Sequence, residues 1–171
     1  MMSLEQLLRQ KRTQLINSWF NKLINTYPDE SAKFFGQQKN QFANPVGHTF
    51  RTNLEKIFDE LLEEECSDRI KEYVDAITRI RAVQGFLPSE AVAYVYFLKD
   101  SIQEVLKKEI KEGGLYQELV QFQNKLDQLT ALTFDIYMQC REQLWEQRAN
   151  FLNSRTHKLL ERANLIKEVE G

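Results

Sequence analysis

The sequence predicts an all-α fold, in which a single helical domain ends in a long C-terminal helix. Only six Gly and three Pro occur in 171 residues, so long stretches run without a helix breaker. Apolar residues recur at helical spacing along most of these stretches. Hydrophobic residues make up 42% of the chain and charged residues 28%, which is ordinary globular usage. We therefore expect one domain of about six helices, whose core needs neither disulfide nor metal.

The first helical pattern runs from Leu4 to Ile24. Thr26-Tyr27-Pro28 ends it, because the residue before a proline disfavours α geometry. A polar stretch containing Phe34 and Phe35 follows, with room for one short helix.

The stretch "QFANPVGHTF" reads as the start of the next helix. Asn44 is a suitable N-cap, and Pro45 fits the first helical position because its missing N–H is not needed there. Gly47 has no side chain, which would let another backbone approach the first turn. His48 has no role in this helix start, so the edge of a ligand site remains the alternative interpretation.

Two further helices occupy the middle of the chain. One begins near Ser67-Asp68 and ends before Gly85, a typical C-terminal stop. The other opens at Pro88-Ser89-Glu90, where we expect Ser89 to act as the cap. The run "AVAYVYFL" makes this helix apolar on nearly every side, which predicts a position at the centre of the domain. Gly113-Gly114 ends it.

The last stretch contains neither Gly nor Pro between Leu115 and Gly171. Its apolar face is broad at first and then narrows to a stripe with a spacing of seven, as in a coiled-coil seam. It either packs on its own domain or protrudes and pairs with a second copy. We favour a homodimer, because the other faces are strongly polar. The predicted dimer seam consists of Trp145, Leu152, Leu159 and Ile166.

Charge and composition argue against several classes of function. The net charge is −2, whereas nucleic-acid-binding proteins usually carry a basic face. The N-terminus lacks the apolar core of a signal peptide, and the longest apolar run is far shorter than the ~20 residues of a transmembrane helix. We therefore expect a cytoplasmic protein with no transmembrane segment and no nucleic-acid partner.

Motifs for catalysis, metals and cofactors are missing from the sequence. It contains no Gly-rich phosphate loop, no G-x-S-x-G and no H-E-x-x-H. The two histidines, His48 and His157, are far apart, which argues against zinc and haem. We expect no enzyme activity, no metal and no cofactor.

Three cations within apolar helical patterns are the candidates for a binding site. Arg81 precedes a bend, Lys99 interrupts the most apolar helix, and Arg141 follows Cys140 in a core-like pattern. Together they would line a small anion pocket; alternatively, each pairs with a carboxylate or extends its charge to solvent.

Three blocks of the sequence carry a family resemblance: "TYPDES…FANPVG" (26–47), "IRAVQGFLPSEAVAYVYFLK" (80–99) and "DIYMQCREQLWEQR" (135–148). They resemble the RsbRD N-terminal domain family, the sensor domain of RsbR-type stressosome co-antagonist proteins. The resemblance covers roughly residues 5 to 150. We therefore expect residues 1–150 to form the sensor domain and residues 151–171 to form a helical tail that resembles a linker helix.

The resemblance implies a globin-like, non-haem fold that dimerises and regulates a protein partner. In RsbR-type proteins a long helix leads to a STAS domain, which this sequence does not contain. We therefore expect either a stand-alone sensor module or one that acts through an unidentified regulatory protein. Ligand or partner binding would rearrange the dimer and its C-terminal helices. The alternative is an accessory protein that binds a larger enzyme or a membrane redox or respiratory complex.

Overall fold

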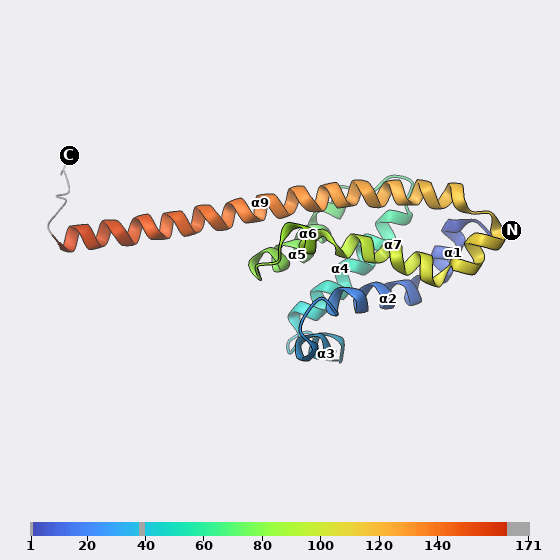
Figure 1. The fold of residues 1–171 in the computed structure, drawn as a ribbon, viewed down its shortest axis with the longest axis horizontal. Coiled ribbons are helices and arrows are strands. Elements are labelled where there is room, and N and C mark those ends of the chain that lie inside the picture. Colours follow the sequence, from blue (N-terminus) through green and yellow to red (C-terminus); the bar gives the residue numbers. More distant parts are fainter. Residues whose placement is uncertain (1, 38–39, 164–171) are drawn as a thin grey trace.

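The computed structural model describes residues 2–37 and 40–163, which fold into one helical domain with a long C-terminal helix, as predicted (Figure 1). These residues contain nine α-helices and no strand. Their bounds are α1 Leu4–Gln10, α2 Arg12–Ile24, α3 Asp29–Gln37, α4 Pro45–Leu62, α5 Arg69–Val83, α6 Pro88–Val92, α7 Tyr94–Val105, α8 Lys107–Gly113 and α9 Tyr116–Arg162.

The six helical stretches expected from sequence correspond to nine helices because two of them are interrupted. The first divides at Lys11 into α1 and α2, and the fifth divides at Ala93 and Leu106 into α6, α7 and α8. A backbone hydrogen bond runs to the carbonyl at each of the three breaks, from Leu15 N to Lys11 O (2.9 Å), from Phe97 N to Ala93 O (3.3 Å) and from Ile110 N to Leu106 O (2.9 Å). The interruptions are therefore local distortions within helical stretches.

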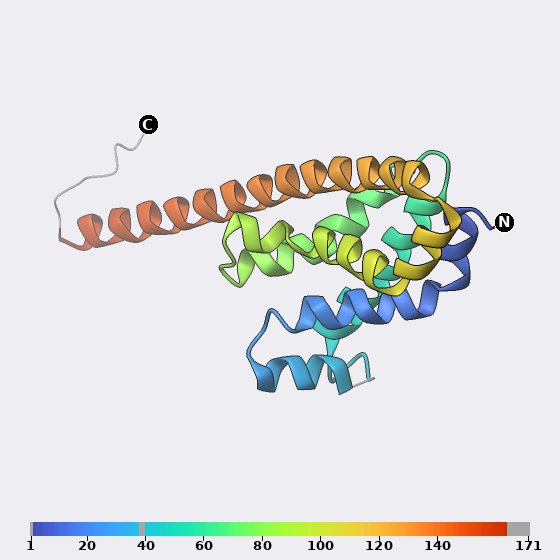
Figure 2. The ribbon, with the colours of Figure 1, turned by 45° about the vertical axis from the view of Figure 1, so that its right-hand side comes forward.

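The core lies where α2 crosses α7 and where α5 packs between α4 and α9 (Figure 2). Trp19 of α2 and Tyr94 of α7 are fully buried, and their rings stack with centroids 6.5 Å apart. The Trp19 indole N–H donates to the Tyr94 carbonyl. This contact fixes the apolar helix at the centre of the domain, as its sequence predicts.

The predicted start of α4 is confirmed, with a different role for its glycine. Asn44 is the N-cap, and its side-chain oxygen accepts from the Gly47 N–H at 2.9 Å. A Cβ at Gly47 would lie 2.3 Å from the Asn44 side chain. Gly47 therefore makes room for the capping side chain, whereas the sequence had suggested room for another backbone.

The helix that starts at Pro88 is capped differently from the prediction. Leu87, rather than Ser89, is the N-cap residue, because Pro88 takes the first helical position. Glu90 reaches back, and its carboxylate accepts from the Leu87 N–H at 2.9 Å. The preceding stop is as predicted: Gly85 has a φ of 83°, a left-handed conformation that favours glycine.

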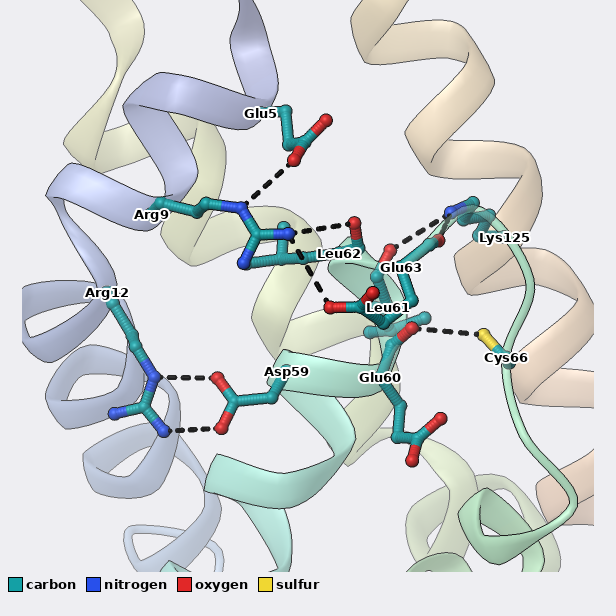
Figure 3. Close-up of polar contacts among 10 residues, drawn as sticks. All are labelled: Glu5, Arg9, Arg12, Asp59, Glu60, Leu61, Leu62, Glu63, Cys66 and Lys125. Atoms are coloured by element: carbon teal, nitrogen blue, oxygen red, sulfur yellow. Dashed lines mark hydrogen bonds and ion pairs between the residues drawn. The ribbon is translucent and has the colours of Figure 1, made fainter.

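The C-terminal end of α4 is held by two cations from other helices (Figure 3). Lys125 of α9 donates to the carbonyls of Leu61 (3.1 Å) and Glu63, and Arg9 of α1 donates to the carbonyl of Leu62 (3.3 Å). These carbonyls lack partners within the helix, and they carry the negative end of its dipole. The two cations therefore join α1, α4 and the first turns of α9.

The second half of α9 extends beyond the rest of the domain (Figure 1). Its last buried residue is Cys140, and every residue from Trp145 to Leu159 is exposed. At 1.5 Å per residue, the part from Arg141 to Arg162 is about 33 Å long. This part of α9, which we call the tail from here on, therefore does not pack on its own domain. Among the described residues, no helix is both long enough and apolar enough to cross a bilayer.

Candidate functional site

The candidate site forms around Arg81, on the last turn of α5. Its side chain is fully buried, although arginine is almost never buried without a partner. Its Nη1 donates to Thr26 Oγ1 at 3.0 Å, and its Nη2 donates to the Glu90 carbonyl at 2.9 Å. The guanidinium carbon lies 4.0 Å from the centroid of the Phe86 ring. Arg81 thereby connects the end of α2, the α5–α6 turn and α6.

The hydrogen bonds of Arg81 go to neutral groups, although the Glu90 carboxylate is near enough to oppose the lowering of its pKa by burial. Both of its hydrogen-bond acceptors are uncharged, and its Nε has no hydrogen-bond partner in the part of the chain that the structure describes. Burial lowers the pKa of Arg81, and the nearby Tyr27 opposes this effect. A buried cation without a paired carboxylate is costly, so its presence marks a functional candidate rather than a stabilising contact.

Arg141 approaches the same place from α9. Its Nη1 donates to the Tyr137 hydroxyl at 3.0 Å, and that hydroxyl donates to the Phe86 carbonyl at 2.6 Å. Tyr137 is buried and Arg141 is half-buried, immediately before α9 leaves the domain. Arg81 thus contacts the Phe86 ring, and Arg141 contacts the tyrosine that is hydrogen-bonded to Phe86.

Lys99 lies on α7 and is half-buried. Among the described residues it forms no ion pair with a carboxylate. Arg81 contacts the Phe86 ring and Arg141 reaches the Phe86 carbonyl through Tyr137, whereas no hydrogen bond of the described residues joins Lys99 to this turn. Anion binding by these three residues stays a prediction.

Tyr27 links this turn to the N-terminal helices through aromatic contacts. Its ring meets Phe86 and Phe35 edge-on, each with centroids 5.2 Å apart. Its hydroxyl donates to the Gln84 side chain at 2.7 Å. Burial raises the pKa of Tyr27, and the Arg81 guanidinium opposes the shift. Tyr27 therefore holds α3 and the α5–α6 turn together.

The three sequence blocks quoted above meet at this site. The first contributes Tyr27, the second Arg81 and Phe86, and the third Tyr137 and Arg141. The sequence prediction identified the two arginines and missed the three aromatic residues. The available signal was that each block contains an aromatic residue: Tyr27, Phe86 and Tyr137.

Titratable groups also occur elsewhere among the described residues. No cluster of His, Cys, Asp and Glu in the described ranges has the arrangement of a metal site. Cys66 and Cys140 are free thiols, and burial raises the pKa of both. His157 lies on the tail, with its Nδ1 3.1 Å from the Glu161 carboxylate. The groups that the candidate site offers are a cation, aromatic faces and a tyrosine hydroxyl.

The predicted dimer seam lies on the exposed tail of α9. Trp145 is 58% exposed, Leu152 59% and Leu159 55%, which is unusual for large apolar side chains at a spacing of seven. Ile166, the fourth predicted seam residue, lies outside the described residues. The neighbouring Phe151 is also exposed, off the stripe.

Comparison with known proteins gives one match. A family model, described as the RsbT co-antagonist protein rsbRD N-terminal domain, matches residues 13–151. No curated protein and no solved structure matches the chain. The matched range contains Arg81, Arg141 and the three aromatic residues around them, and it ends where the tail has already left the domain.

Proposed function

The chain belongs to the RsbT co-antagonist protein rsbRD N-terminal domain family, and on that premise we propose that it senses a signal through a dimer. The family indicates a sensory or regulatory domain of the stressosome type. In our proposal the domain has no enzymatic activity of its own. Binding of a ligand or partner favours one arrangement of the dimer, and the C-terminal helices transmit the change to a regulatory protein.

The observation that carries this proposal is the uncovered apolar stripe on α9. A polar helix that projects into water with large apolar side chains at a spacing of seven is stabilised when a second helix covers them. The stripe fits a second copy of the same helix, because Trp145, Leu152 and Leu159 would then face their own equivalents.

Arginines beside the stripe favour a parallel pair. Arg141, Arg148, Arg155 and Arg162 repeat with the same spacing of seven. If Leu152 and Leu159 occupy d positions, these arginines occupy g positions, whose charges influence orientation. Antiparallel helices would place arginines opposite arginines, whereas parallel helices place Arg141 opposite Glu146 of the second copy. A parallel pair brings the two domains to the same end, as a signalling dimer requires.

The contacts at the base of the tail support the proposed transmission. Tyr137, at the base of the tail, donates to the Phe86 carbonyl of the α5–α6 turn, and Arg141 donates to the Tyr137 hydroxyl. A shift of that turn would move these side chains relative to the seam. A signal changes the balance only by binding the two arrangements with different affinity.

The test introduces two charges into the seam. Leu152→Asp together with Leu159→Asp should convert a dimer into a monomer, as measured by native mass spectrometry at micromolar concentration. The matched control is Gln147→Asp with Ser154→Asp, which adds the same charges at exposed positions with the same spacing. The control should remain dimeric. An unchanged dimer in the first variant would refute the seam.

The alternative is an accessory protein that binds a larger enzyme or a membrane redox or respiratory complex. The weakness of the predicted seam favours it. Ala149 and Thr156 occupy the positions between the large apolar residues and fill little volume. A partner's helix would then cover the stripe. A monomeric wild-type chain in the same experiment would favour this alternative, and a dimer would favour the sensory proposal.

A further inference from the structure

A cavity of about 410 Å³ opens between α2, α3 and α4, away from the α9 tail. Small-molecule sites usually have volumes of roughly 300–1,000 Å³ and combine apolar walls with a few fixed polar groups. Here Phe20 and Phe35 form the apolar wall, and Asn17, His48 and Arg51 supply polar groups. The alternative interpretation of the stretch 41–50, as the edge of a ligand site, concerns the same cavity, because Asn44, Gly47 and His48 all line it.

The walls of this cavity are firmly held. Phe20 is buried in the core, and Phe35 packs edge-on against Tyr27 with centroids 5.2 Å apart. At Gly36 an added Cβ would lie 3.1 Å from the Ile24 side chain, so backbone rather than a side chain lines the cavity there. The cavity is therefore largely formed before any ligand binds.

Arg51 gives the cavity a fixed positive charge. Its Nη1 donates to Asn17 Oδ1 at 2.9 Å, and its guanidinium carbon lies 4.2 Å from the centroid of the Phe20 ring. None of the lining residues is acidic, and no carboxylate of the described residues forms an ion pair with Arg51. A guanidinium that is already oriented loses little freedom when it binds an oxyanion.

The first turn of α4 lines the cavity, but its Gly47 N–H is not available to a ligand. This N–H is already bonded to the Asn44 side chain. The positive group that faces the cavity is therefore the Arg51 side chain, with the exposed His48 imidazole at the rim.

We propose that this cavity binds a small organic carboxylate, whose carboxylate pairs with Arg51 and whose apolar body lies against Phe20 and Phe35. A planar carboxylate matches the two-pronged geometry of guanidinium. The inference rests on the proposed sensory function, for which it supplies the class of signal. Phe35 contacts Tyr27, and Tyr27 contacts Phe86, so the cavity is joined by packed side chains to the site around Arg81.

The test is a titration of the ¹⁵N-labelled full chain with benzoate, followed through backbone amide shifts. Acetate is the smaller probe, and benzamide is the uncharged match for benzoate. Benzoate should shift the Gly36 and Gly47 amides in a saturable manner, with acetate weaker and benzamide at least tenfold weaker. Arg51→Gln should weaken benzoate binding at least tenfold, because the charge-assisted pair is lost. Arg79→Gln removes an exposed arginine outside the cavity and should leave binding unchanged.

Several outcomes would overturn the proposal: no saturable shift with benzoate or acetate, equal binding of benzamide, or full binding in Arg51→Gln. If Arg51→Gln does not fold, Arg51→Lys keeps the charge without the two-pronged geometry and should bind with intermediate affinity. The titration is repeated on the chain with Leu152→Asp and Leu159→Asp. Binding that persists in a monomer separates failure of the dimer proposal from failure of the cavity proposal.

Discussion

Arg81 combines a large buried volume with a charge that forms no ion pair with a carboxylate in the part of the chain that the structure describes. Its volume fills the space between α2, α5 and α6, while its hydrogen bonds go to Thr26 and to the Glu90 carbonyl. These two properties have opposite effects on stability: filled volume stabilises the fold, and a buried charge destabilises it. A pair of substitutions can separate them.

We expect Arg81→Ala to lower the free energy of unfolding by about 3–5 kcal/mol, the usual range when a large buried side chain is truncated. Arg81→Met should cost only about 1–2 kcal/mol, because it keeps most of the volume and removes the desolvated charge. Urea denaturation of both variants measures the difference. Equal losses in the two variants would show that the hydrogen bonds and ring contact of Arg81 outweigh its desolvation.

The sequence predicted parts of the site to different degrees. Arg81 and Arg141 were identifiable because a cation within an apolar helical pattern is unusual wherever it lies. Their meeting at Phe86 was not identifiable, because it depends on a carbonyl in a turn and on how α9 crosses α5 and α6. Lys99 has the same sequence signature, but no hydrogen bond of the described residues joins it to this turn, so the pattern alone does not distinguish the three cations.

Helix ends that depend on local chemistry were predictable. Asn44 caps α4 and Gly85 follows α5, because a side-chain oxygen and a left-handed glycine act within a few residues of themselves. The divisions at Lys11, Ala93 and Leu106 carry no such local signal. α6 and α8 contact α9, and the Leu4 N–H of α1 donates to Glu118 of α9, and a single sequence does not display such contacts.

At the C-terminal end of α4, a side chain from another helix supplies the hydrogen bonds that the last carbonyls lack. We expect Lys125→Met to lower the free energy of unfolding by about 1–2 kcal/mol, because two helix-end carbonyls lose a charged donor while the aliphatic stem is kept. Lys158→Met, on the exposed tail of the same helix, is the control and should change stability by less than about 0.5 kcal/mol. Similar values for both variants, from denaturation curves, would mean that water satisfies these carbonyls equally well.

The fold places the proposed ligand cavity and the proposed dimer seam at separate locations, with aromatic packing between them. Phe35, Tyr27 and Phe86 are in contact in that order, and the Phe86 carbonyl accepts from Tyr137 at the base of the tail. Such a series transmits a signal only if it has two arrangements that both sites influence. The Tyr137 hydroxyl is the point in it that can be removed with the least change in volume.

We expect Tyr137→Phe to abolish the response of the tail to ligand binding in the cavity while leaving the binding itself intact. The substitution removes the bond to the Phe86 carbonyl and the acceptor for Arg141, at a loss in stability of about 1–2 kcal/mol. In the wild-type chain we expect benzoate to shift the Trp145 indole N–H as well as the Gly36 and Gly47 amides. In Tyr137→Phe the two amides should still shift, whereas the shift of the Trp145 indole should disappear. Tyr96→Phe, at an exposed tyrosine of α7, should keep both responses. A Trp145 response that survives in Tyr137→Phe would show that the tail responds by another route, because the only hydrogen bond from that tyrosine to the α5–α6 turn in the described structure would be gone.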